Sequence, residues 1–219
     1  MLQIAVRLYQ HPAGPACYNL EKGAEMEKWT RKRIIETFTE LVSKYSYEGV
    51  TVQHILEKAE VSKTTFYRYF RDKADVMDAR FRVLYDEAVA SHDCRSLQDL
   101  FTILLKQSRE QADQYAMFAT TGFNSYREFV YRYTMTMGQT IMETAWGRPV
   151  NEQEKFYISF FCAGGAKILQ DWARGKQFAD MSAEEVAGLM CRMIHPRYQV
   201  RLDDGMRDEL LKRMKKRVL

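Results

Sequence analysis

Residues 51–73 read TVQHILEKAEVSKTTFYRYFRDK, and this stretch decides the fold of the N-terminal part of the chain. Thr51 and Ser62 are residue types that favour helix N-caps, and apolar residues follow each of them at helical spacing. The pattern predicts two short helices, over about 51–59 and 62–70, with a tight turn at 60–62. Such a pair forms a helix-turn-helix unit, whose second helix fits the major groove of DNA.

The second of these helices has one apolar and one polar face. Phe66 and Phe70 are four residues apart and are expected to face the core. The other face offers hydrogen-bond donors for base edges and phosphates and has no acid: Lys63, Thr64, Thr65, Tyr67 and Arg68. This surface suits DNA. A plain helical hairpin whose polar face is only hydrated is the alternative.

Helical periodicity extends from about residue 27 to the C-terminus, so the sequence predicts an all-α fold. The first helix, over 27–45, has an apolar stripe made of Ile34, Ile35, Phe38, Leu41, Val42 and Tyr45. Cap and glycine signals delimit further helices over about 72–91, 96–108, 125–146, 152–174, 182–195 and 204–218. Residues 1–25 contain two prolines and no helical period. We expect them to be an irregular extension, and Met26 could be the natural start.

Composition and charge are compatible with a nucleic-acid-binding protein and argue against disulfide-rich, zinc-ribbon and membrane proteins. The 219 residues include 33 basic and 29 acidic ones, a formal net charge of +4. The bases cluster at 28–33, 62–73 and 201–219, where they can neutralise nucleic-acid phosphates or simply form hydrated faces. The four cysteines are scattered, which argues against a disulfide scaffold or a zinc ribbon. A signal sequence and a membrane span are not recognisable, so we expect a cytoplasmic protein without a membrane partner.

Enzyme motifs are not recognisable in the sequence. The G-x-S-x-G, H-E-x-x-H, P-loop and G-x-G-x-x-G patterns do not occur, and the four histidines are isolated. Ser91, His92, Asp93 and Cys94 are adjacent, but neighbouring side chains on a helix point apart and cannot form a triad. We therefore expect no catalytic residues, no cofactor and no metal site.

The region over about 28–77 resembles the DNA-binding domain of the TetR family of bacterial transcriptional regulators. The resemblance rests on a basic first helix, Thr51 at the start of the second, and the run from Val61 to Tyr67 followed by Tyr69, Phe70 and Lys73. It implies that Thr51 and Lys73 bind phosphates, that Lys63, Thr64 and Thr65 face the groove, and that Tyr67 and Tyr69 contact backbone or bases. Glu60 and Thr64 stand where glycine is frequent in the family.

The resemblance implies that the second half is a helical domain that binds a small-molecule ligand and forms a dimer. We expect four segments: the extension 1–25, the DNA-binding domain 26–75, the helical domain 76–195, and a basic, helical tail 196–219. The helix over 125–146 has an apolar stripe that belongs either to the core or to a ligand pocket. The candidate pocket residues are Met117, Phe118, Phe123, Tyr126, Phe129, Tyr133 and Trp146.

Gly164 and Gly165 lie in the middle of a predicted helix, where each costs about 1 kcal/mol relative to alanine. Close approach of another backbone would explain them. We therefore predict a homodimer through residues 152–195, with packing inside one chain as the alternative. The resulting hypothesis is a ligand-responsive repressor that a small molecule releases from a double-stranded DNA operator. The rival hypotheses are a helical interaction protein or co-regulator with the same fold and, more remotely, a helical-bundle enzyme.

Overall fold

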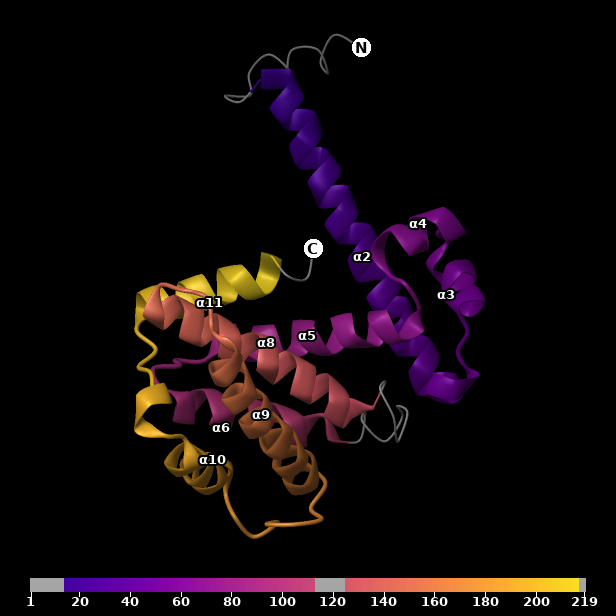
Figure 1. The fold of residues 1–219 in the computed structure, drawn as a ribbon. Helices are drawn as coiled ribbons and strands as arrows, with labels where there is room; N and C mark the ends of the chain where they lie inside the picture. Colours follow the sequence, from indigo (N-terminus) through magenta and orange to yellow (C-terminus); the bar gives the residue numbers. More distant parts are fainter. Residues whose placement is uncertain (1–13, 113–124, 217–219) are drawn as a thin grey trace. The chain divides into compact units, whose positions relative to one another are not determined.

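The structure is a computed structural model that describes residues 14–112 and 125–216 (Figure 1). Within these residues the regular structure is helical, apart from an isolated antiparallel bridge between Ser96 and Arg201. The prediction of an all-α fold is confirmed. The chain divides into two compact units: the first comprises residues up to Tyr45 together with Gly49–Met77, and the second comprises Ser46–Glu48 and the chain from Asp78 onward.

The first unit contains α2 (Gly14–Gly49), α3 (Val52–Ala59) and α4 (Lys63–Tyr69), and it includes the beginning of α5 (Lys73–Ser91). Its core consists of fully or almost fully buried apolar side chains from these helices: Ile34, Phe38, Val42, Ile55, Ala59, Phe66, Phe70, Val76 and Met77. The predicted inward positions of α2 and α4 therefore lie in the core. Tyr45 is an exception, with 49% of its surface exposed. It immediately precedes Ser46, whose φ of 64° breaks the helical path, so Tyr45 lies at the end of the apolar stripe.

The first helix begins earlier than the sequence suggested. It begins at Gly14, so the expectation of an irregular segment is wrong for residues 14–25, while 1–13 lie outside the described residues. Pro15 is compatible with a first helical turn, where its missing N–H would have no partner in any case. The segment also extends an existing helix, and adding residues to a helix avoids the cost of nucleation.

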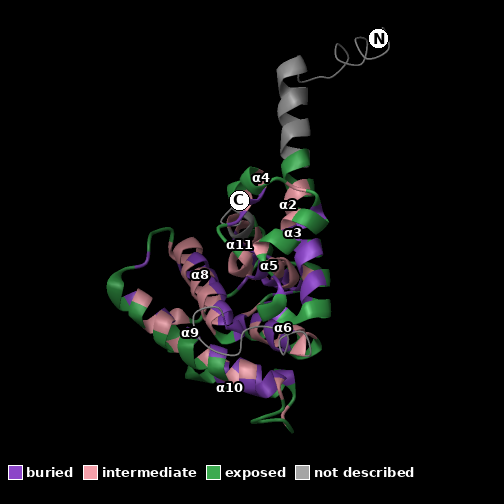
Figure 2. Ribbon diagram, turned by 90° about the vertical axis from the view of Figure 1, so that its right-hand side faces the viewer, coloured by how far each residue is buried: buried purple, intermediate pink, exposed green. Residues whose placement is uncertain are grey.

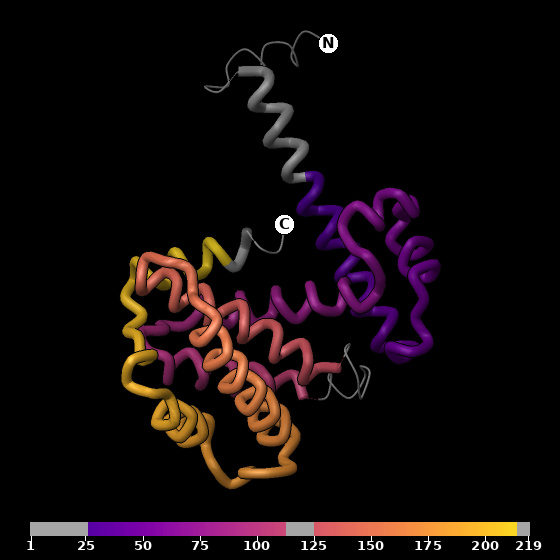
Figure 3. Tube along the Cα trace, in the orientation of Figure 1, coloured from indigo at the N-terminus to yellow at the C-terminus, as the bar shows by residue number. Residues whose placement is uncertain are grey.

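The second unit contains α6 (Leu97–Glu110), α8 (Tyr126–Trp146), α9 (Glu152–Ala173), α10 (Ala183–Met193), the 3-10 helix η1 (Pro196–Tyr198) and α11 (Asp204–Lys216), which can be followed along the trace in Figure 3. α8 packs against α9 and α11, and α6 packs against α9 and α10. The predicted caps form as expected: the side chains of Ser96, Ser125, Asn151 and Ser182 accept hydrogen bonds from backbone N–H groups three residues later.

The C-terminal segment is helical, as predicted, but it is not a separate tail. The backbone N–H of Leu202 donates to the carbonyl oxygen of Arg95 at 3.0 Å, and Leu202 is buried. α11 packs against α8 and buries Leu210. The compact unit therefore continues past residue 196, because Leu202 and Leu210 are buried in it. The expected boundary followed from the helix end before Pro196 and the basic character of the segment, which do not show this packing.

An aromatic cluster occupies the core between α5 and α8 in the second unit, where Figure 2 shows buried residues in purple. Phe129 of α8 lies 5.3 Å from Phe81 and 6.0 Å from Tyr85 of α5, measured between ring centroids. The hydroxyl of Ser108 is buried beside those of Tyr85 and Tyr126. One face of α8 therefore belongs to this cluster, which leaves the opposite face to pack against α9.

Candidate nucleic-acid interface and apolar cavity

Thr51 begins the helix-turn-helix with a capping interaction. Its hydroxyl accepts a hydrogen bond of 3.2 Å from the backbone N–H of His54, and the His54 ring nitrogen Nδ1 accepts from the Thr51 N–H at 3.4 Å. This reciprocal pair satisfies backbone donors that the first turn of α3 would otherwise leave without partners. Thr51 is exposed, so its hydroxyl hydrogen can be donated to an anion.

The turn between α3 and α4 contains a residue in the left-handed region. Glu60 has φ 52° and ψ 44°, and its N–H donates to the carbonyl oxygens of Glu57 and Leu56. A residue with a Cβ atom in this conformation costs about 1 kcal/mol relative to glycine. A positive φ is therefore present at the position where glycine is frequent in the family, and glutamate adopts it. The Glu60 carboxylate also contacts the Arg33 guanidinium of α2, with Oε2 2.5 Å from Nη2.

α4 turns an exposed, acid-free face away from the core. Ser62 caps the helix by accepting from the N–H of Thr65 at 3.0 Å, and Phe66 is fully buried. Four side chains on the other side of the helix are exposed: Lys63, Thr64, Tyr67 and Arg68. Their positions are i, i+1, i+4 and i+5, which lie on one face of a helix.

Three further predicted contact residues are half-buried. The hydroxyl of Thr65 lies 2.8 Å from that of Ser62, so it takes part in the cap. The Arg68 guanidinium lies over the Tyr69 ring, with 5.3 Å between the Arg68 Cζ atom and the centroid of the ring. Lys73 Nζ donates to the carbonyl oxygen of Val50 at 2.7 Å, directly before Thr51. The structure therefore brings Lys73 to the start of α3, although the two residues are far apart in sequence.

Acidic residues next to the basic clusters were missed by the sequence reasoning. Lys32 pairs with Glu36 at 3.6 Å, and Arg71 contacts Asp75 through its side chain and its backbone N–H. Burial opposes ionisation of Asp75, but the hydrogen bonds from Arg71 outweigh it and lower the pKa of that carboxyl. The spacing of four residues is a readable signal for both pairs. Arg33 and Glu60 are 27 residues apart, and no local pattern indicates their pairing.

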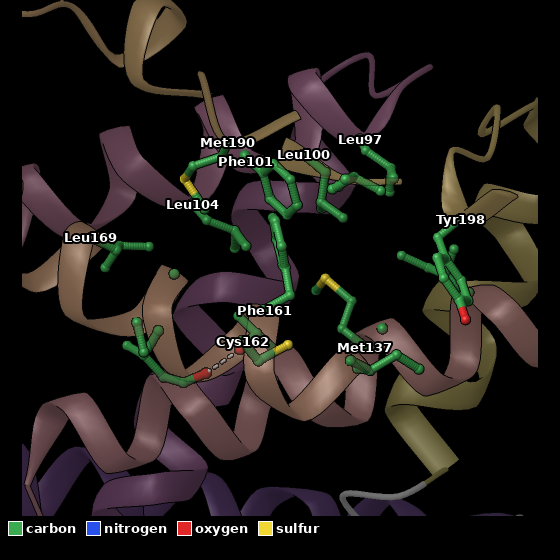
Figure 4. Close-up of a pocket in the computed structure, with 18 of the residues that line it drawn as sticks. Leu97, Leu100, Phe101, Leu104, Met137, Phe161, Cys162, Leu169, Met190 and Tyr198 are labelled. Carbon is green, nitrogen blue, oxygen red and sulfur yellow. Dashed lines mark hydrogen bonds between the residues drawn. The ribbon is translucent and has the colours of Figure 1, made fainter. Parts of the chain in front are cut away.

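A separate cavity lies inside the second unit (Figure 4). It has a volume of about 80 Å³, and its walls come from α6, α8, α9 and α10, with Tyr198 of η1 at one end and Leu169 at the other. The face of α8 that lines it carries Val130, Thr134, Met137 and Ile141, opposite the aromatic cluster. None of the described residues that line the cavity is charged.

The four predicted pocket residues that the structure describes do not line this cavity. Tyr126, Phe129 and Tyr133 are buried against α5, so the stripe they form belongs to the core. Trp146 lies next to Tyr198, with 5.8 Å between ring centroids, and is not part of the cavity wall. Met117, Phe118 and Phe123 lie outside the described residues. The sequence pattern identified an apolar stripe on α8, but both faces of this helix carry apolar residues.

The outer surface of α9 and α10 carries large exposed apolar side chains. Phe156 and Phe160 of α9 are 74% and 75% exposed, and Met193 of α10 is 76% exposed. Gly164, eight residues after Phe156, is exposed as well, and a Cβ atom there would have no described heavy atom within 4 Å. A Cβ atom on Gly165 would lie 3.3 Å from Cε of Met190. Adjacent glycines therefore have different surroundings: Gly165 lies against Met190, whereas the side of Gly164 that a Cβ atom would occupy faces none of the described residues.

Comparisons with known proteins match the part of the chain that forms the helix-turn-helix of the first unit. A sequence profile described as "Bacterial regulatory proteins, tetR family" matches residues 34–79. The HTH-type transcriptional repressor KstR of Mycolicibacterium smegmatis is 37% identical over 57 residues, which are 26% of this chain and 28% of that protein. The uncharacterized HTH-type transcriptional regulator YdeS of Bacillus subtilis is 31% identical over 83 residues, or 37% of this chain and 42% of that protein. The chain thus matches less than half the length of these relatives.

The fold is also similar to that of a solved structure over most of the chain. It is the crystal structure of a TetR transcriptional regulator from Rhodococcus sp. RHA1, with a TM-score of 0.51 and 21% sequence identity over 76% of this chain and 96% of that one. At this identity the likeness concerns the fold. Among the described residues, no helix combines the length and the apolar character needed to cross a bilayer.

Proposed function

We propose that this chain, which belongs to the TetR family of bacterial regulatory proteins, is a transcriptional repressor that binds operator DNA as a homodimer and responds to a small molecule. The exposed, acid-free face of α4 is the observation that carries the proposal. The face combines two cations with hydroxyl groups, and Ser62 and the buried Phe66 fix the helix that presents it. A rigid helix with such a face can donate hydrogen bonds to base edges in the major groove.

The proposed contacts fall into two groups. Lys63, Thr64, Thr65, Tyr67 and Arg68 belong to the recognition helix. Thr64 and Tyr67 are exposed there, and we assign them to sequence readout. Thr51 caps α3, Tyr69 is the last residue of α4 and Lys73 is the first of α5, and we assign these three to the phosphate backbone. An ammonium group carries three N–H donors, so Lys73 can contact a phosphate while it donates to Val50.

The proposed dimer forms through α9 and α10, within residues 152–195. Phe156, Phe160 and Met193 expose large apolar surfaces that water would otherwise cover. Gly164 on the same helix as the phenylalanines leaves room for the backbone of a second chain. A symmetric dimer would present two recognition helices, so the operator should contain two related half-sites.

The proposed ligand site is the apolar cavity of the second unit. A ligand that binds one arrangement of α6, α8 and α9 more tightly than another would shift the balance between them. If the two arrangements differ in the separation of the recognition helices of the dimer, the ligand changes operator affinity by the same coupling free energy. The expected coupling is about 1–3 kcal/mol, roughly a 5- to 150-fold change in affinity.

Titration of DNA binding tests the proposal. Fluorescently labelled DNA from upstream of the protein's own gene is titrated at several salt concentrations, with a shuffled sequence of equal composition as control. We expect at least about 1,000-fold tighter binding to the upstream DNA, and steep weakening with salt on both. Thr64→Ala should reduce that ratio without changing the melting temperature. Absence of measurable binding, or weak binding that is equal on both DNAs, would instead favour the co-regulator hypothesis, in which the same fold contacts only proteins.

A further inference from the structure

The described wall of the cavity in the second unit contains almost no available polar group. Among the residues that the structure describes, no acidic, basic or amide side chain lines the cavity. Thr134 lies on the wall, but its hydroxyl donates to the carbonyl oxygen of Val130 at 2.8 Å. The Tyr157 hydroxyl accepts from the backbone N–H of His195 at 2.7 Å. The Thr134 hydroxyl hydrogen is thus used within the protein, and the other polar groups of the described wall are the neutral hydroxyls of Tyr157 and Tyr198 and the Cys162 thiol.

The thiol of Cys162, which lies on the wall, is neutral at physiological pH. Cys162 of α9 is buried, and this burial raises the pKa of its thiol to about 11. The aromatic ring of Tyr198 stacks on that of Tyr157 with 4.0 Å between centroids, and it closes the end of the cavity at the right of Figure 4. A ligand inside would therefore meet carbon and sulfur atoms on nearly every side.

We infer that the cavity binds an uncharged, apolar compound, either a small hydrocarbon or the end of a neutral aliphatic chain. This deepens the proposed function and rests on it, because the compound would be the small molecule to which the repressor responds. Moving an ionised group into such surroundings is strongly unfavourable, and the described residues of this wall offer no countercharge in return. A neutral hydrocarbon loses little on entering and gains dispersion contacts.

The wall can adapt to the size of the guest. A volume of about 80 Å³ is about half that of an engineered apolar cavity of about 150 Å³ that binds benzene. Met137, Met142 and Met190 lie on the wall, and unbranched thioether side chains change rotamer readily. Figure 4 shows Met190 and Met137 on opposite sides of the cavity. Rotation of these side chains would enlarge it for a ring or a short chain.

Three compounds of similar size test the charge requirement. Toluene, benzoate and benzylammonium are added to the full chain without DNA, and binding is measured by calorimetry and by the shift in melting temperature. Because each is too small to keep an ionised group in solvent while its ring is enclosed, we expect benzoate and benzylammonium to bind at least about 100-fold more weakly than toluene. n-Pentane is included as a narrower neutral compound. Tight binding of either ion, or no binding of toluene and pentane, would overturn the inference.

Variants locate the binding in the cavity. Gly165→Ala adds a methyl group beside Met190 on the wall, whereas Gly188→Ala adds one in α10 against Gln98, outside the cavity. Both replace a helical glycine by alanine, so their effects on helix propensity match. We expect Gly165→Ala to weaken toluene binding at least about threefold and Gly188→Ala to leave it unchanged. Leu169→Ala enlarges the cavity and should strengthen toluene binding. Equal effects of all three variants on toluene binding would show that toluene does not bind in this cavity.

Failure of the inferred cavity ligand can be distinguished from failure of the proposed repressor function. Binding of toluene without any change in operator affinity would uphold the cavity assignment and remove the regulatory role. Operator binding that responds to no neutral compound, in a protein that also fails to bind toluene or pentane, would overturn the assignment and leave DNA recognition intact.

Discussion

The guanidinium of Arg33 in α2 lies 2.5 Å from the carboxylate of Glu60, the residue with positive φ in the helix-turn-helix. The same residue therefore has an unfavourable backbone conformation and a favourable charge contact. The contact is between exposed groups, and pairs of this kind contribute about 0–1 kcal/mol. The two effects can be separated by substitution.

Glu60→Gly should be more stable than Glu60→Gln. Both variants lose the ion pair with Arg33, but only glycine removes the steric cost of φ 52°. We expect the free energy of unfolding of the glycine variant to exceed that of the glutamine variant by about 0.5–1 kcal/mol. Urea denaturation of both variants, followed by circular dichroism, measures the difference. A glutamine variant as stable as the glycine variant would mean that the turn relaxes to another conformation.

Lys73→Ala should weaken binding to every DNA sequence and reduce the slope of log affinity against log salt by about one ion. The reason is the proposed phosphate contact of Nζ. Because Lys73 also donates to Val50, the melting temperature of the variant is measured alongside. Thr64→Ala should change the preference among operator variants and leave the salt slope intact. A change of preference in Lys73→Ala with an unchanged slope would exclude the phosphate assignment.

Gly164→Leu should raise the dissociation constant of the dimer at least tenfold, about 1.4 kcal/mol. The Cβ atom of the leucine would contact no described heavy atom of its own chain within 4 Å, so the loss is expected from the approach of a second chain. Sedimentation equilibrium at micromolar concentrations measures it. Tyr45→Glu, which changes an exposed aromatic residue of the first unit, is the control. A wild-type protein that is monomeric under these conditions would refute the proposed interface.

Acid should destabilise the second unit through Glu154. Hydrogen bonds from the Arg148 side chain and the Asn151 backbone N–H lower the pKa of this carboxyl from 4.5 to about 2. The folded-state pKa lies below the unfolded one, so this stabilisation is fully present above about pH 5 and is lost as the pH falls towards about 2. Glu154→Gln should flatten that part of the pH profile. Identical profiles for the variant and the wild type would show that Glu154 does not contribute.

The features that the sequence predicted correctly depend on short-range interactions. Ser96 and Ser182 cap their helices because a side chain reaches a backbone N–H three residues ahead, which the sequence displays directly. Buried Phe66 and exposed Tyr67 likewise follow from helical spacing.

The features that could not be predicted from the sequence depend on tertiary packing. Phe129 and Met137 belong to the same apolar helix, yet only Met137 lines the cavity. Which face of α8 meets α5 depends on segments distant in sequence. The exposure of Phe156 and Met193 could not be predicted from helical periodicity either. Apolar residues at helical spacing predict a buried face, but they do not show whether the same chain or a second chain covers that face.

The hydrogen bond from Leu202 to Arg95 has a consequence for biosynthesis. The first unit ends at Met77, so a ribosome has exposed all of its residues while much of the chain is still to be made. The second unit pairs residues that lie more than about 100 positions apart, and α8 can pack against α11 only after those later residues have been translated. Long-range closure of this kind slows folding. The order of synthesis thus favours early folding of the first unit and later folding of the second, because the part of α8 that α11 covers stays exposed in the nascent chain until α11 has been made.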